Sequence, residues 1–295
     1  MRWLRALALS LVVLLASLLA VLAIGLLWPT TEAPVQRTTT AIAITGARVV
    51  DVASGSAKDG LTVVVAGGRV ITVGAAAEVA PPAGSQVVDG AGRYLVPGFW
   101  DMHAHLHADN PAYRANPRLE FVPWMQRQVW MQDADRMAAG DPSPEGRRAH
   151  LDFYHAGLAL TANAHARGVR ILAGTDANDT YSFPGSGLHD ELEELVQAGL
   201  SPADALRASI TRGPEYFGLS KDYGAVEVGK LADLVLLDGN PLEDIRNTRR
   251  ISVVIFNGNA YRRGDLDRLL DYVKSQARSL PLSIKIIWAF VRSQF

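Results

Sequence analysis

The spacing of hydrophobic and polar positions changes along this chain. Residues 6–28 are an unbroken apolar run, and short runs of alternating residues follow from 41 to 95. Helix-like spacing then dominates the middle of the chain, and strand-like runs return after Gly224. A period of two is typical of β-strands and a period of 3.6 of α-helices. The pattern therefore predicts an α/β protein with a β region on each side of a mixed region.

The first apolar run is long enough to cross a bilayer. It has 23 residues from Ala6 to Trp28 without a charge, and Arg2 and Arg5 precede it. A cleaved signal peptide is the alternative, although its apolar core is usually shorter. Because basic flanks stay in the cytoplasm, an anchor would place the rest of the chain outside it, on the periplasmic side of the inner membrane in a bacterium. Residues 29–40 are expected to be a linker.

Strand-like runs flank the mixed region on both sides. The stretch LTVVVAGGRVITVG predicts a hairpin that turns at Gly67-Gly68, and ISVVIFNGNAY predicts another that turns at Asn257-Gly258. We expect the two flanks, residues 41–96 and 224–262, to build one composite β-sandwich domain.

The mixed region carries helical patterns at 123–139 and 149–167 and a buried strand in GVRILAGTD. The stretch LHDELEELVQAGL predicts a helix with Leu192 and Leu195 on its apolar face. Ser201 is placed to be the N-cap of the next helix.

Histidines occupy alternate positions in PGFWDMHAHLH, directly after an apolar strand. Residues i and i+2 of a strand face the same way, so Asp101, His103 and His105 are expected on one face at its carboxyl end. Two imidazoles placed there can bind one metal ion. His107 is expected beyond the strand. Asp176 ends another predicted strand, where it can bind the metal and accept a proton from metal-bound water, or cap the following turn.

Composition excludes several classes of protein. The chain has 295 residues and no cysteine, which rules out disulfides, iron–sulfur clusters and cysteine nucleophiles. Its 29 basic and 30 acidic residues leave a net charge of −1, so we expect no nucleic-acid partner. The oligomeric state stays open.

Four segments together resemble the metal-dependent amidohydrolase superfamily, in its imidazolonepropionase-like branch with Xaa-Pro dipeptidase relatives. They are YLVPGFWDMHAHLH, GVRILAGTDAND, LHDELEELVQAGLSPADALRASI and GAVEVGKLADLVLLDGNPLEDIRNTRRISVVIFNGN, and the match runs from about residue 43 to 270. The resemblance implies a TIM-type (β/α)8 barrel beside the composite domain. It also implies that a divalent metal, expected to be Zn²⁺, activates water to hydrolyse the amide or cyclic amide bond of a small-molecule or peptide-like substrate.

Residue by residue, the resemblance makes His103 and His105 the metal ligands of the first barrel strand. Asp176 matches the aspartate of the eighth strand, which is both a metal ligand and the general base. His189 lies where relatives also carry histidine, and its role is open between the site and packing at a helix start.

The central region is short for a barrel. It has 125 residues from Phe99 to Tyr223, whereas a full barrel has about 250. The second to sixth strands of the family pattern are missing, and no lysine lies between His103 and Asp176 to form the family's carboxylated bridge between two metals. We therefore expect a truncated barrel over 97–223 with at most one metal ion. The alternative is a catalytically impaired relative with only a binding or structural role.

The remaining histidines of this region and the chain's end complete the expectations. His150, His155 and His165 lie in helical surroundings. Residues 263–295 are expected to be a helical tail. At the other end of the chain, residues 1–28 are expected to be the anchor or signal. The stretch LPLSIKIIWAFVRSQF is too short to span a bilayer, and it is either an interfacial amphipathic helix or a packed terminal helix.

Overall fold

The computed structural model describes residues 2–29, 31–35, 40–102, 113–140, 143–177 and 179–293. The chain divides into two compact units. The first unit combines Met1–Val35, Ala112–Met137 and Asp267–Phe295, and the second combines Gln36–Pro111 and Ala138–Leu266.

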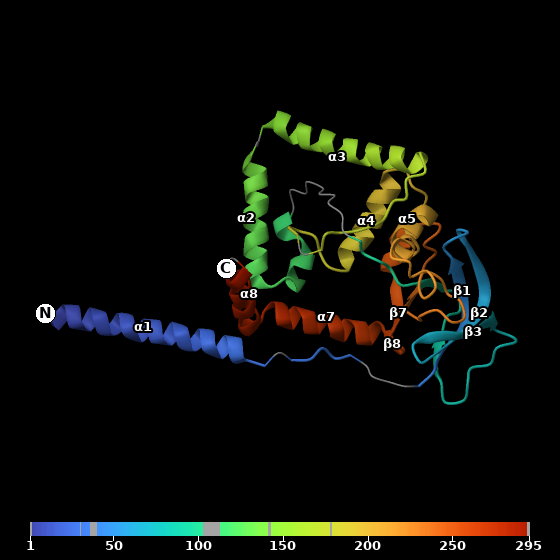
Figure 1. Ribbon diagram of the computed structural model, residues 1–295, viewed down its shortest axis with the longest axis horizontal. Helices are drawn as coiled ribbons and strands as arrows, with labels where there is room; N and C mark the ends of the chain where they lie inside the picture. The colour runs from blue at the N-terminus through green and yellow to red at the C-terminus, as the bar shows by residue number, and fades with distance from the viewer. Residues whose placement is uncertain are drawn as a thin grey trace. The chain divides into compact units, whose positions relative to one another are not determined.

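Strands from both flanks of the second unit share one sheet (Figure 1). The sheet has eight strands in the order β3-β2-β1-β5-β6-β7-β8, with β4 paired to β1. Only the pairs of β1 with β4 and β5 are parallel, and the antiparallel pair of β5 with β6 joins the two flanks. The strands are β1 (Ile42–Asp51), β2 (Ser56–Ala66), β3 (Arg69–Ala75), β4 (Gln86–Asp89), β5 (Tyr94–Pro97), β6 (Leu234–Leu237), β7 (Ile251–Phe256) and β8 (Asn259–Arg262).

The sheet curves around an apolar core on one of its faces. The backbone N–H of Val70 in β3 donates to Lys230 O at 2.9 Å, and the N–H of Ala232 donates to Gly68 O at 2.9 Å. The far edge of the sheet thus meets the segment that leads into β6. Apolar side chains from both flanks, among them Ile44 and Ile255, pack into one cluster. The described strands of both flanks therefore form one curved sheet, and the expected β-sandwich stays a prediction.

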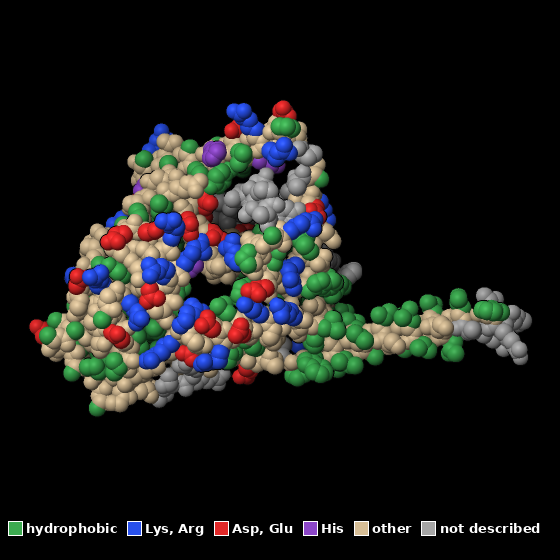
Figure 2. Space-filling view, turned by 180° about the vertical axis from the view of Figure 1, so that it is seen from behind, with side chains coloured by type: hydrophobic (Ala, Val, Ile, Leu, Met, Phe, Trp, Pro, Cys, Tyr) green, Lys and Arg blue, Asp and Glu red, His purple; other side chains and the backbone are tan. Residues whose placement is uncertain are grey.

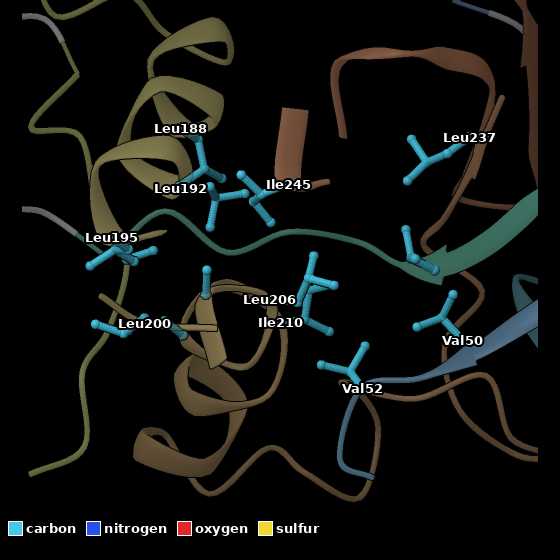
Figure 3. Packing of buried hydrophobic residues seen from close by; sticks show 14 of the residues in the cluster. Val50, Val52, Leu188, Leu192, Leu195, Leu200, Leu206, Ile210, Leu237 and Ile245 are labelled. Atoms are coloured by element: carbon cyan, nitrogen blue, oxygen red, sulfur yellow. The ribbon is translucent and has the colours of Figure 1, made fainter. Parts of the chain in front are cut away.

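Helices pack on the other face of β5 and β6. Residues of α4 (Ser186–Gln197), α5 (Pro202–Ile210) and the short 3-10 helix η3 (Ile245–Arg249) form a cluster with these strands, which Leu158 of α3 (Pro144–Ala166) joins. The five-residue helix α6 (Arg212–Tyr216) follows α5. Figure 3 shows Leu188 and Leu192 of α4 beside Ile245, with Leu206 of α5 close by and Leu195 farther along α4. Since β5 and β6 are buried on both faces, both are continuous apolar runs instead of alternating ones.

The local signals behave as the sequence predicts. Ser201 caps α5, with its hydroxyl accepting from Asp204 N at 3.1 Å. Gly67 and Gly68 turn the hairpin of β2 and β3 with φ of 57° and 74°, values that favour glycine. The apolar face of α4 is buried as expected.

The predicted strand GVRILAGTD is extended but joins no ladder. Within the described part of the chain between β5 and β6, the one bridge is that of Ala177 with Asp179. The backbone groups of GVRILAGTD form single hydrogen bonds to separate parts of the chain, so no repeated strand pairing results. The assignment of 97–223 to a truncated barrel therefore stays a prediction.

The first unit consists of helices. They are α1 (Arg2–Leu27), η1 (Tyr113–Ala115), η2 (Pro117–Phe121), α2 (Trp124–Gly140), α7 (Arg263–Ala277) and α8 (Leu280–Ser293), where the ends of α2 and α7 run into the second unit. Among the described helices α1 alone is long and apolar enough to cross a membrane, with a mean hydropathy of 3.0 over Leu7–Leu27. Most residues of that stretch are exposed, and Figure 2 shows hydrophobic side chains along the helix.

Candidate functional site

Two extended segments lie side by side at the candidate site. Residues 98–102 leave β5, and the Trp100 N–H donates to Ser209 O at 2.5 Å. The Met102 N–H donates to Ala173 O at 2.9 Å, and the Ala173 N–H donates to Ala208 O at 3.1 Å. The segment that precedes the predicted histidine ligands thus meets the segment that leads to Asp176, anchored on the end of α5.

A carboxylate joins the ends of these two segments. Asp101 accepts from the Thr175 N–H at 2.7 Å and from the Thr175 hydroxyl at 2.5 Å. Both carboxylate oxygens are used, so the pair fixes the position and the orientation of Thr175 relative to Asp101. The alternation of the strand predicts that Asp101 lies on the histidine face, but it does not predict this partner, which lies 74 positions away.

The backbone of Asp176 is held on both sides. Before it, the Ser182 hydroxyl donates to Thr175 O, and after it, the Asp179 N–H donates to Asp176 O at 2.9 Å. Asp176 itself adopts a φ of 52°, in the left-handed region that aspartate enters more readily than most residues. Such conformations persist only where the surroundings hold them, and they recur at ligand-binding turns.

The predicted metal ligands are only partly described. His103 and His105 lie outside the described residues, as does His107. Asp176 is described, and no three His, Asp or Glu side chains in the described ranges are grouped to hold a metal ion. The metal set of His103, His105 and Asp176 therefore stays a prediction.

A second carboxylate, which was not among the predicted site residues, lies beneath this turn. Glu191 of α4 is only 7% exposed and accepts a hydrogen bond from the Gly174 backbone. Burial raises the pKa of Glu191 to about 7, the Gly174 hydrogen bond opposes that rise, and the negative charges of Glu194 and Asp101 add to it. The carboxyl is therefore close to half-protonated at neutral pH.

The sequence did contain a signal for Glu191. It lies three residues after Leu188 and four before Leu195, and both leucines are buried on the apolar face of α4. A carboxylate at those spacings lies on the buried stripe of a helix, where acidic residues are rare unless they have a partner.

His189 has a packing role. Its Nδ1 lies 3.0 Å from the Thr248 hydroxyl, which itself donates to Ile245 O at 2.7 Å. Nδ1 is therefore the donor, and the edge of the ring meets Phe99 with the ring centres 5.9 Å apart. Burial first and the charge of Arg249 second lower the pKa of His189 to about 4, so the ring is neutral at pH 7.

The other described histidines belong to α3, as their helical surroundings predicted. His165 Nε2 lies 3.6 Å from Asp204, which also binds Arg207 and the N-cap Ser201. His155 packs beside the ring of Tyr154. These partners are those of structural side chains rather than of metal ligands.

Comparisons with known proteins support the amidohydrolase superfamily. Residues 154–261 match the model described as "Amidohydrolase family". A dihydroorotase of Thermus aquaticus is 30% identical over 169 residues, which is 54% of this chain and 39% of that protein. An adenine deaminase of Mesorhizobium japonicum (strain LMG 29417 / CECT 9101 / MAFF 303099) is 42% identical over 67 residues, 23% of this chain and 11% of that protein.

A solved structure titled bottromycin amidohydrolase is similar to this chain with a TM-score of 0.63. The identity is 15%, and the match covers 89% of this chain and 94% of the other, so the likeness is one of fold. This chain spans less than half the length of the two curated relatives. The matched family region includes Asp176 and Glu191 but not Asp101 or the alternating histidines. The specific branch suggested by the sequence stays a prediction.

Proposed function

We propose that this chain, which carries an amidohydrolase family domain over residues 154–261, hydrolyses a carbon–nitrogen bond. The substrate would be a small molecule or peptide-like compound with an amide or cyclic amide. The relatives named as a dihydroorotase and an adenine deaminase support this class of reaction.

The observation that carries the proposal is the bond from Thr175 to Asp101. It holds the residue before Asp176 against the segment that leads to His103. A general base must be held in a fixed geometry, and a carboxylate at this turn meets that need. Asp176 would take a proton from the attacking water and pass it to the leaving nitrogen, while Asp101 positions the turn.

A divalent metal, zinc by the family resemblance, would supply the activated water when it is bound. The metal ion would be bound by Asp176 together with His103 and His105. Carboxylate and imidazole are ligands that zinc prefers, so the chemistry of this donor set fits such an ion. Thr175 and Ser182 would keep the Asp176 backbone in place, whether or not the ion is bound.

Replacing Asp176 by Asn tests this role. We expect a loss of about 100-fold or more in kcat/KM, the usual effect of removing a general base. Asp179→Asn is the matched control, because it removes an exposed carboxylate from the same turn and keeps the oxygen that accepts from the Thr180 N–H. The assay is hydrolysis of a panel of amides and cyclic amides, followed by mass spectrometry, with metal content measured on the same protein.

Two results would end the enzymatic proposal. One is wild-type protein that binds less than about one metal ion per ten chains after incubation with zinc and turns over no substrate of the panel. The other is equal turnover by wild type and Asp176→Asn, which would show that this carboxylate takes no part.

The second candidate is a catalytically impaired relative with a binding or structural role. Two observations favour it, the absence of lysine between His103 and Asp176 and the absence of a strand ladder in the described residues between β5 and β6. It predicts weak metal binding and no turnover, and tight metal binding with turnover would exclude it.

We also propose that α1 is an uncleaved membrane anchor with the second unit outside the cytoplasm. Within the first unit, Lys285 Nζ donates to Trp28 O at 2.7 Å, and the Tyr272 hydroxyl donates to Thr31 O at 2.5 Å. Removal of residues 1–31 as a signal peptide would leave Lys285 and Tyr272 without these acceptors. Intact mass of protein isolated from membranes tests the proposal, and a mass short of α1 would refute it.

A further inference from the structure

We infer that α8 lies in the membrane interface beside the point where α1 leaves the bilayer, with anionic lipid headgroups as its partners. The inference rests on the proposed anchoring role of α1. It concerns a second membrane contact, formed by the opposite end of the chain.

The first half of α8 packs against the end of α1. Ile284 is 9% exposed and lies against Gly25, which is buried in an otherwise exposed helix. A Cβ added to Gly25 would lie 2.3 Å from Ile284 Cδ1, so any larger residue at position 25 requires Ile284 to shift. Small residues allow such close contacts between helices in membranes.

A charged side chain fixes the level of α8 relative to α1. Lys285 donates to Trp28 O, which is one residue beyond the end of α1. A cation at a helix C-terminus is favoured by the exposed carbonyls and the helix dipole. Trp28 is a residue type enriched where a membrane helix meets the headgroups, so α8 starts at that depth.

The second half of α8 exposes large apolar side chains. Ile287, Trp288 and Val291 are each 40% to 42% exposed, and Leu280 at the start of the helix is 64% exposed. They add to the exposed apolar surface of α1, beside its C-terminal end. With 14 residues α8 is about 21 Å long and cannot cross a hydrocarbon core of about 30 Å. An apolar helix of this length next to an anchor fits a position along the interface.

The basic residues at the C-terminal end of the chain favour anionic lipids. From Lys274 to Phe295 the charged side chains are all basic, namely Lys274, Arg278, Lys285 and Arg292. Lys274 pairs with Glu120 at 2.9 Å, so the charges that favour anionic lipid are those of Arg278, Lys285 and Arg292. Basic residues next to a membrane helix are attracted by anionic headgroups. Arg292 is exposed beyond the contact with α1 and is therefore placed to meet a phosphate at the surface.

Nitroxide labels can test this in the full-length chain, because the protein has no cysteine of its own. Val291→Cys reports on α8, and Leu15→Cys reports on the middle of α1. Ala83→Cys is the aqueous control, since it lies in an exposed loop between β3 and β4. Each labelled protein is placed in vesicles of equimolar phosphatidylcholine and phosphatidylglycerol, and its collision rates with oxygen and with a water-soluble nickel chelate are measured.

We expect the ratio of oxygen to nickel collisions at position 291 to exceed that at position 83 severalfold. Low collision rates with both probes would place α8 against protein, and high rates with both would place it in water. Either result overturns the inference. A lipid-embedded label at 15 together with an aqueous label at 291 refutes the position of α8 alone, whereas an aqueous label at 15 refutes the anchor as well.

Lipid charge is tested with the same labels. In vesicles of phosphatidylcholine alone the ratio at position 291 should fall, and Arg292→Gln should reduce its dependence on phosphatidylglycerol. A ratio that is the same in both kinds of vesicle would contradict the anionic partner. Gly25→Leu should lower the ratio at 291 while leaving that at 15 unchanged, because the larger side chain displaces Ile284.

Discussion

Replacing Glu191 by Gln should stabilise the protein by an amount that grows with pH. The carboxyl is 7% exposed, and its pKa is raised from 4.5 to about 7, mainly by burial. Gln has nearly the same shape and keeps an oxygen that can accept from the Gly174 N–H, but it carries no charge to bury. The comparison therefore isolates the cost of ionising this side chain inside the fold.

The sign follows from proton binding. Between pH 4.5 and 7 the folded protein keeps a proton on Glu191 that the unfolded chain has released, so the stability of the wild type falls as pH rises. This rise in the pKa of Glu191 lowers the free energy of unfolding of the wild type by about 3 kcal/mol once the pH is well above 7. At pH 5 the loss is under about 1 kcal/mol. Glu191→Gln should thus match the wild type near pH 4.5 and exceed it by about 3 kcal/mol at pH 8.

His189 titrates in the same pH range, but its effect on stability has the opposite sign. The pKa of His189 is lowered from 6.5 to about 4, so its contribution to stability is full above pH 6.5 and is lost as pH falls toward 4. The two effects oppose each other in the wild type, which would hide both in a single pH profile. The difference between wild type and Glu191→Gln cancels the term of His189, because both proteins contain it.

Urea unfolding followed by circular dichroism, in a nonionic detergent at several pH values, measures this difference. Glu78→Gln is the control, since it makes the same chemical change at an exposed position and should stay close to the wild type throughout. A difference between Glu191→Gln and wild type that is constant from pH 4.5 to 8, or that shrinks as pH rises, would refute the burial of an ionisable Glu191.

Two further changes test the packing of α4. Leu192→Ala should cost about 2–5 kcal/mol in urea unfolding, because Leu192 is fully buried in the core, whereas Leu160→Ala at a 70% exposed position of α3 should change stability by less than about 0.5 kcal/mol. Equal losses would place Leu192 outside the core. Arg249→Gln breaks ion pairs with Asp190 and Glu193, but its side chain is 36% exposed, so we expect a loss below about 1 kcal/mol that disappears in high salt. A larger loss that salt does not reduce would contradict a screened surface pair.

Much of the local structure could be predicted from the residues alone. The glycine pair at 67 and 68 turns a hairpin, and Ser201 caps α5. The buried face of α4 includes Leu192 and Leu195. These features depend on backbone preferences and on side-chain spacing within one element, which a sequence contains directly. The apolar length of the first helix and the order of the family segments along the chain are likewise readable without coordinates.

The candidate site depends on contacts between distant positions. The bond of Asp101 with Thr175 joins residues 74 positions apart, and the pairing of β5 with β6 joins strands more than 130 positions apart. Spacing told us that Asp101 and Asp176 each end a segment, but not that Thr175 would join those ends. The leucine spacing of α4 indicates that Glu191 lies on a buried face, but its hydrogen bond from the Gly174 backbone depends on the tertiary structure.

The sequence by itself determined the anchor-length helix, the helix and hairpin signals and the family resemblance. Tertiary structure alone decided that both flanks build one curved sheet, that a buried carboxyl lies under the Asp176 turn, and that the last helix packs on the end of the first through Gly25. Local preferences act over a few residues and are written in their order, whereas the burial of a charge or the approach of two helices depends on which distant surfaces exclude water together.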